Sequence, residues 1–270
     1  MGKQVMEDLK GLVVIIPVHE FNDEVKDMLE NAIASVPKGI EIRISCKKGI
    51  KDDIEKGIKK NKNIVFFEKE DELSDFCSLV NNAVKGSEYF SILEFDDTYS
   101  PIWFDNFKMY KDFFSDVSIY LPLNDLVDAS NGNKYVGVGN EAPWASSFSN
   151  EIGYIDNDCL QNFFDFYMPG GIFRTSDFEE VGMLKPSIKL TFWYEFLLRF
   201  TNKGKKIYVI PKIGYTHVLG RPGSIFDEYK NTISPEESEW WVKLAKKEFH
   251  FKEDRPEKAI YKPEESEEDE

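Results

Sequence analysis

The residues best suited to chemistry are three acids, Glu94, Asp96 and Asp97, which directly follow an apolar run at residues 89–93. Like charges this close repel, so the cluster requires a compensating cation. In an extended segment residues i and i+2 point the same way, so Glu94 and Asp96 can converge on one ion. Hard oxygen ligands suit Mg²⁺ or Mn²⁺, which proteins often share with substrate phosphates. The alternative is a strand that simply ends in solvated acids.

The elements before these acids predict a mostly parallel α/β sheet, because strand and helix patterns alternate with short links. The predicted elements are strands at 12–17, 40–45, 64–67 and 89–93, and helices at 22–36, 54–58 and 73–84. In such sheets ligands bind beyond the carboxyl ends of the strands. Residues 17–20 and 94–97 both lie at such ends, so we expect them to face one crevice.

The second half of the chain is predicted to add fewer regular elements. They are helices at 103–114, from 175, at 192–200 and at 235–249, and strands at 117–123 and 207–211. Residues 125–162 show little periodicity, which indicates a functional segment or small elements that a pattern does not reveal. Six acids within 264–270 predict a disordered tail. The predicted organisation is one domain at 10–230, a C-terminal helix at 231–255 and the tail at 256–270.

Composition indicates a folded protein of the cytoplasm. The 270 residues are 41% hydrophobic and 14% aromatic, and the net charge of -15 argues against nucleic-acid binding, which needs clustered Lys and Arg. Cys46, Cys77 and Cys159 are odd in number and widely spaced, so we interpret them as reduced core thiols. No apolar run approaches the roughly 18 residues that span a bilayer, and the N-terminus lacks a secretory pattern.

Four segments occur in a recognisable order. Residues 17–20 read P-V-H-E, residues 81–97 read N-N-A-V-K-G-S-E-Y-F-S-I-L-E-F-D-D, residues 171–184 read G-I-F-R-T-S-D-F-E-E-V-G-M-L, and residues 198–207 read L-R-F-T-N-K-G-K-K-I. This order resembles the GT-A catalytic domain of family 2 glycosyltransferases, with its P-V-Y-N-E, E-Y-I-x-F-L-D-x-D-D, F-R-R-x-x-F-x-x-V-G-G-F and L-R-x-x-x-x-G-x-K-I segments. The resemblance covers about three quarters of the chain and implies a GT-A fold.

The resemblance implies metal-assisted, inverting transfer of a sugar from a nucleotide-diphosphate donor to an unidentified acceptor. Glu94 and Asp96 would occupy the family's D-x-D place and hold Mn²⁺ or Mg²⁺, with His217 as third ligand. Asp97 would support the ion or contact the ribose. The other residues implied to contact the donor are Pro17, Val18, His19, Glu20, Lys47, Arg221 and Ser224.

Two positions depart from the family pattern. Alignment through Arg199 places Trp193 at the usual catalytic base, which leaves Glu195 as the nearby candidate for that role. The alternative for Glu195 is a helical ion pair with Arg199, four residues on. The family's V-D-D-G-S, whose first Asp holds uracil, is replaced by S-C-K-K-G at 45–49. A uridine donor bound in the usual way is therefore not expected, although Lys47 can still meet a phosphate.

These departures leave two other classes of function open. The fold can serve as a binding or structural module without turnover, in which 140–158, the Trp240-Trp241 pair and the acidic tail would bind a protein partner. For Trp240-Trp241 the favoured interpretation is that one face packs the last helix onto the domain. Residues 148–173 and 192–199 also resemble glycosyltransferase-like proteins of large phages, for which a virion-bound role or action in the host cytoplasm is plausible. Nucleotidyl transfer fits the acids, but a Gly-rich basic loop after the first strand is missing.

Overall fold

The computed structural model describes residues 9–70 and 75–249. The strands are β1 (Leu12–Val18), β2 (Glu41–Cys46), β3 (Ile64–Glu68), β4 (Tyr89–Ile92), β5 (Thr98–Tyr99), β6 (Val117–Asp128), β7 (Lys134–Gly139), β8 (Tyr154–Ile155), β9 (Ile172–Arg174) and β10 (Lys206–Leu219). The helices are α2 (Asp23–Ser35), α3 (Lys51–Gly57), α4 (Phe76–Ala83), α5 (Trp103–Phe113), α6 (Asn157–Leu160), α7 (Thr175–Glu180), α8 (Phe192–Asn202), α9 (Ile225–Thr232) and α10 (Pro235–Phe249), with short 3₁₀ turns η1 (Ala129–Asn131) and η2 (Ala142–Trp144).

Within the described residues the strands form one ten-stranded sheet, ordered β3-β2-β1-β4-β9-β6-β10-β5, with β7 paired to β6 and β8 to β10. β1 is parallel to β2 and β4, and β2 is parallel to β3. Every residue of β1 is buried, as expected for a β-branched strand covered on both faces. α2 is capped by Asn22, whose side chain accepts a hydrogen bond from Val25 N at 2.9 Å. The predicted mostly parallel α/β sheet is confirmed.

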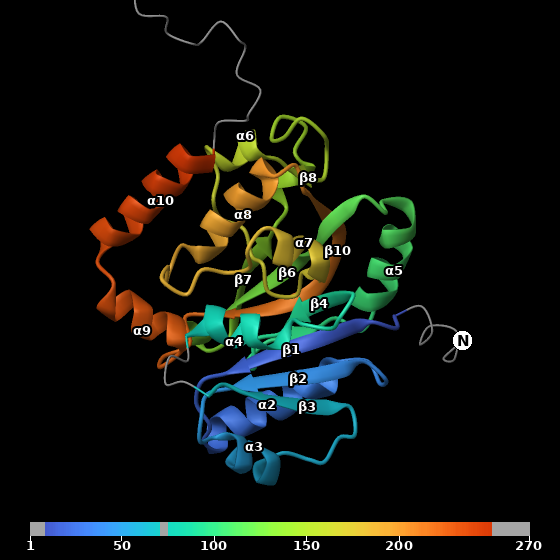
Figure 1. The fold of residues 1–270 in the computed structure, drawn as a ribbon, viewed down its shortest axis with the longest axis vertical. Helices are drawn as coiled ribbons and strands as arrows, with labels where there is room; N and C mark the ends of the chain where they lie inside the picture. The colour runs from blue at the N-terminus through green and yellow to red at the C-terminus, as the bar shows by residue number, and fades with distance from the viewer. Residues whose placement is uncertain (1–8, 71–74, 250–270) are drawn as a thin grey trace, which may run out of the picture.

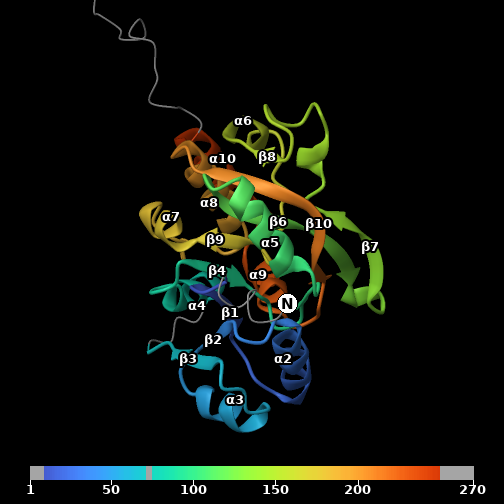
Figure 2. The ribbon, with the colours of Figure 1, turned by 90° about the vertical axis from the view of Figure 1, so that its right-hand side faces the viewer.

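Helices cover both faces of the sheet and bury two cores (Figures 1 and 2). One core joins the sheet to α4, α7, α8 and α10, and includes the stacked rings of Phe90 and Phe173. The other joins the sheet to α2, α3 and α5, and includes the fully buried Trp103. In Figure 1, α9 lies beside α4 at the side to which β1 and β2 point. The carboxyl ends of the parallel strands therefore meet α4 and α9.

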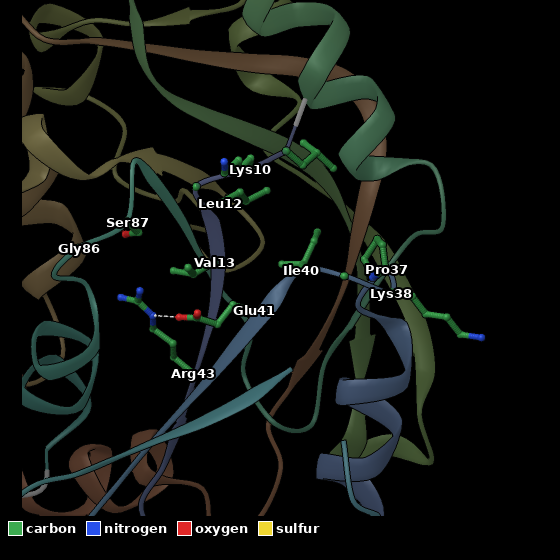
Figure 3. Close-up of a pocket in the computed structure, with 13 residues that line it drawn as sticks. Lys10, Leu12, Val13, Pro37, Lys38, Ile40, Glu41, Arg43, Gly86 and Ser87 are labelled. Carbon is green, nitrogen blue, oxygen red and sulfur yellow. Dashed lines mark hydrogen bonds and ion pairs between the residues drawn. The ribbon is translucent and has the colours of Figure 1, made fainter. Parts of the chain in front are cut away.

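Arg43 of β2 joins the C-terminal end of α4 to the sheet, and Figure 3 shows it paired with Glu41. Its Nη1 donates to the carbonyls of Ala83 and Lys85, each at 2.7 Å, and its Nε donates to Glu41 at 2.6 Å. These contacts satisfy carbonyls at the end of α4 that have no partner within the helix. The neighbouring hollow of about 280 Å³ lies at the opposite ends of the strands from Glu94. Arg43 therefore acts in the scaffold and leaves the carboxyl edge free.

Three segments extend beyond the sequence prediction. β10 was predicted to stop at Pro211 but continues to Leu219, because register shifts between Val209 and Ile213 absorb the missing N–H of the proline. The aperiodic stretch at 125–162 contains the end of β6, the hairpin strand β7, and short elements including β8 and α6. α9 was not predicted. Its presence places Ser224 at a helix N-cap, where the side chain accepts from Asp227 N at 3.1 Å.

The last predicted helix is present as α10 and packs on α8. Ala245 is buried in the same core, and Asn202 Nδ2 donates to the carbonyl of Phe249 at 2.9 Å. Trp241 packs partly into this core, whereas Trp240 is 55% exposed. The predicted acidic tail at 256–270 lies outside the described residues. In 9–70 and 75–249, no helix combines the length and apolar character that a membrane crossing requires.

Candidate active site

The backbone around the acid cluster is fixed from two directions. Leu93 N donates to the Ile15 carbonyl at 2.9 Å, which continues the pairing with β1 past the end of β4. Glu94 N donates to the hydroxyl of Tyr215 at 3.1 Å, from β10. Asp97 N then donates to the Glu94 carbonyl at 3.1 Å, so the chain folds back in a tight turn. This turn brings the Asp97 side chain toward Glu94.

Asp97, Glu94 and His217 form one convergent group. One ligand-type atom of each lies within 4.8 Å of the others. The Asp97 side chain accepts from Val218 N at 2.7 Å and pairs with His217 Nδ1 at 2.8 Å, and the residue is only 1% exposed. The ring of Tyr167 packs edge-on against His217, with centroids 5.5 Å apart. His217 is therefore held in one orientation by a buried carboxylate and an aromatic ring.

Asp96 points to a different partner. The Nε of Arg221 donates to Asp96 Oδ2 at 2.7 Å, and its Nη1 lies 3.8 Å from Glu20 Oε1. The guanidinium also lies over the ring of Phe95, 5.0 Å from the centroid. Arg221 thus joins the loop after β10 to the ends of β1 and β4. The sequence-based metal set was Glu94, Asp96 and His217; in this structure Asp97 takes the place beside the other two.

The charges of the group influence one another. Burial, followed by the charge of Asp97, raises the pKa of Glu94 well above its usual range. Burial alone would lower the pKa of His217, but the Asp97 charge and hydrogen bond, with Glu94 and Asp96, raise it to about 9. Three acids and two cations, His217 and Arg221, therefore share one small volume. The positive charges of His217 and Arg221 therefore offset most of the negative charge of the three acids.

The donor set fits a divalent metal ion. Two carboxylates and one imidazole are within coordinating reach of a common point. Hard oxygen donors with one nitrogen suit Mn²⁺ and Mg²⁺ better than soft metals. A carboxylate hydrogen-bonded to a histidine also fixes the ring for metal binding. The residues best placed to hold the ion are Glu94, Asp97 and His217.

A pocket of about 390 Å³ opens beside this group. Its polar wall contains Glu94, Asp96, His217, Arg221, Ser224, Lys230, Asp165 and Asp227, and its apolar wall contains Tyr167, Trp193 and Phe226 among others. Pro17 and His19 line a smaller adjoining hollow with Arg221 and Ser224. Val18 is fully buried in β1, and Lys47 follows β2. The structure therefore brings most of the predicted donor residues to one edge of the sheet.

Glu195, the candidate base, does not line this pocket. Its side chain is buried and pairs with Arg199 at 2.8 Å and with Lys185 at 2.8 Å. The pairing with Arg199 is the helical contact expected from their spacing. Trp193, two residues earlier on α8, faces the pocket instead. Neighbours two apart on a helix point in different directions, so only one of them can reach the site.

Local patterns left three contacts of the site unrecognised. Two of them are Tyr215 and Tyr167. The sequence around each tyrosine has no pattern that distinguishes a site residue from an aromatic residue of the core. Phe226 lies on α9, which does have a sequence signal: Ser224 followed three residues later by Asp227 resembles a capping box. Recognition of that start would have placed Phe226 and Lys230 on a helix at the pocket wall.

His19 predicts a pH dependence of stability. Burial, then the charges of Arg221 and Lys47, lowers its pKa from 6.5 to about 4. The unfolded chain therefore binds a proton between these values that the folded chain does not. We expect the contribution of neutral His19 to the free energy of unfolding to be fully present above pH 6.5. It should be lost as the pH falls toward 4, with an upper limit of roughly 3 kcal/mol. Urea unfolding measured across this range would detect the loss.

A His19→Gln variant is the reference for that measurement. The wild type minus variant difference in unfolding free energy isolates His19 from the acids that titrate in the same range. We expect the difference to change with pH in the direction given above. A difference that stays constant from pH 7 to pH 4.5 would show that His19 titrates alike in both states.

Comparison with known proteins identifies the fold. No protein-family model and no curated protein matches the chain. It is similar to S. aureus TarS: residues 1–349 in complex with UDP-GlcNAc give a TM-score of 0.63 at 17% identity, over 87% of this chain and 65% of that one. The UDP complex gives 0.55 at 13%, over 88% and 72%. A third structure gives 0.54 at 13%, over 77% and 60%.

At these identities the likeness concerns the fold. The GT-A arrangement predicted from the sequence is confirmed by it. The chain spans 60% and 65% of the length of two of these TarS structures. Two of the three TarS structures are complexes with a uridine nucleotide, UDP-GlcNAc in one and UDP in the other.

Proposed function

We propose that this chain is a glycosyltransferase that moves a sugar from a nucleoside-diphosphate donor to a hydroxyl-bearing acceptor, with inversion at the anomeric carbon. The main support is the convergence of Glu94, Asp97 and His217 beside Arg221, at the carboxyl edge of a GT-A sheet. A departing diphosphate needs positive charge placed where negative charge develops. That TarS, with the same fold, is described in complex with UDP-GlcNAc supports a donor of this class.

Some of these side chains would contact the departing diphosphate, and others would contact the rest of the donor. Arg221 would exchange its contact with Asp96 for a forked contact with the diphosphate. Ser224 caps α9 at the pocket wall, so the first N–H groups of that helix add positive potential there. A divalent ion, Mn²⁺ or Mg²⁺, held by Glu94, Asp97 and His217 would neutralise charge on the leaving group. His19, Glu20 and Lys47 would contact the rest of the donor.

A second candidate is a GT-A module that binds a nucleotide without turnover. The observation that favours it is on α8, where Trp193 replaces the usual base and Glu195 is held by Arg199. Under this proposal the metal and the nucleotide still bind, but no donor is consumed. Binding and turnover must therefore be measured separately.

Calorimetry with Mn²⁺ and a panel of UDP, GDP and their sugars tests the proposal. We expect one nucleotide to bind when Mn²⁺ is present and to bind far more weakly in EDTA, because no divalent cation then bridges the diphosphate to the carboxylates of Glu94 and Asp97. Binding without nucleotide release from any donor sugar would favour the second candidate. If no nucleotide of the panel binds with or without metal, neither candidate survives.

A further inference from the structure

We propose that Asp165 is the general base that accepts the proton of the acceptor hydroxyl. This assignment rests on the glycosyltransferase function proposed above. It answers the difficulty that the usual base position holds Trp193, an indole that cannot take a proton. Asp165 lies in the connection between α6 and β9, and it lines the same 390 Å³ pocket as Glu94, His217 and Trp193.

Four carboxylates line this pocket: Glu94, Asp96, Asp165 and Asp227. Three of them have other partners. Glu94 belongs to the metal-type group, Asp96 is paired with Arg221, and Asp227 accepts from Gly223 N at 3.2 Å at the start of α9. Within 9–70 and 75–249, the structure gives the Asp165 side chain neither a hydrogen bond nor an ion pair. Asp165 is thus the pocket carboxylate whose lone pairs are available to a substrate.

The backbone next to Asp165 is anchored, although it belongs to no helix or strand. Phe166 is buried against Phe163 and Phe148, with ring centroids 5.1 and 6.1 Å away. Tyr167 N donates to Asn140 Oδ1 at 2.9 Å, and Asn140 Nδ2 donates to the Tyr167 carbonyl at 2.8 Å. A base must be held in place to act efficiently. Asp165 is exposed, but its neighbours fix where it stands.

Trp193 forms part of the apolar wall of the pocket that Asp165 also lines. Its ring stacks on Phe173, 5.9 Å between centroids and 19° between planes, so the side chain is rigid. It lines the pocket together with Phe226 and Leu190. An apolar wall of this kind can cover the C–H face of an acceptor while a carboxylate takes its hydroxyl. The wall and Asp165 would thus share the two tasks of orienting and activating the acceptor.

The step balances without a further reactant. The acceptor oxygen forms a bond to the anomeric carbon as its proton passes to the Asp165 carboxylate. The bond between that carbon and the phosphate oxygen breaks, and its electron pair leaves with the nucleoside diphosphate. Arg221 pairs with the charge that arrives on the leaving group. Asp165 then returns its proton to water.

The test uses donors of known structure with water or azide as acceptor. Wild type, Asp165→Asn and Asp112→Asn are incubated with Mn²⁺ and either UDP-GlcNAc or GDP-mannose, and nucleotide release is followed. Asp112 lies on α5, exposed and outside the pocket, and is the matched control. We expect Asp165→Asn to slow hydrolysis about 100-fold or more, as loss of a general base does, while nucleotide affinity and melting temperature stay unchanged.

Azide separates base catalysis from other causes of inactivity. Azide is already an anion and needs no base, so we expect Asp165→Asn to form glycosyl azide as fast as the wild type. Equal hydrolysis by wild type and Asp165→Asn overturns the base assignment and leaves the transferase function intact. The base assignment is also overturned if Asp165→Asn loses nucleotide affinity, or if the wild type forms glycosyl azide and Asp165→Asn does not. If the wild type releases nucleotide from neither donor, the proposed function fails and this role falls with it.

Discussion

Asp97→Asn is expected to weaken Mn²⁺-dependent nucleotide binding by about 100-fold, the upper end of losses seen when carboxylates around a metal are replaced. The asparagine keeps the size of the side chain, and its oxygen can still accept from Val218 N. It removes the charge that pairs with His217 and contributes to the three-ligand group. Calorimetric titration of Mn²⁺ with nucleotide, below the melting temperature of each variant, measures the change.

Asp112→Asn again provides the control, because it removes one carboxylate from an exposed helix position. Its nucleotide affinity should equal that of the wild type, which excludes an effect of net charge alone. An Asp97→Asn protein that binds Mn²⁺ and nucleotide normally would show that the ion is held elsewhere. Asp96 would then be the residue to replace next, since it is the acid of the cluster that pairs with Arg221.

Arg199→Ala is expected to lower the free energy of unfolding by about 3 kcal/mol, the lower end of the cost of breaking a buried ion pair, because Lys185 still pairs with Glu195 in the variant. Arg199 pairs with Glu195, which is only 4% exposed, and also donates to the carbonyls of Val181 and Met183. These contacts clamp the turn that follows α7. Urea unfolding followed by circular dichroism measures the loss.

The double variant Glu195→Gln, Arg199→Met is the informative companion. It removes both charges, so no uncompensated charge stays buried, and its loss should be smaller than the sum of the single losses. Glu195→Gln alone should unfold more easily yet release nucleotide from donor at an unchanged rate while folded. A Glu195→Gln protein of normal stability that has lost turnover would return the base role to Glu195.

Much of the first half of the fold follows from local signals. The β-branched run before Pro17 and the Asn22 cap predict β1 and α2 within a residue or two, since strand burial and capping act locally. The hairpin of β6 and β7 also had a signal that went unused. Asn131-Gly132 is a common turn pair, and the residues on both sides form strands.

The candidate site depended on information that local patterns lack. Alternation along a strand led to the pairing of Glu94 with Asp96, but β4 ends at Ile92 and the turn at 94–97 reverses that geometry. Asp97 meets a histidine 120 residues away, and no spacing rule predicts such a contact. Only the order of segments, through the family resemblance, indicated that His217 belonged with the acids. The partners of Asp96 and Glu195 required the folded arrangement of side chains.

The position of β10 also has a consequence for synthesis of the chain. The acids at 94–97 leave the ribosome long before His217 and Arg221, which follow them by 120 and 125 residues. The parallel unit of β1 to β4 can form early, because its contacts are close in sequence. Until β10 arrives, however, three neighbouring carboxylates lack both of their cations. The growing chain therefore carries the mutual repulsion of these acids until its last strand and the loop after it supply His217 and Arg221.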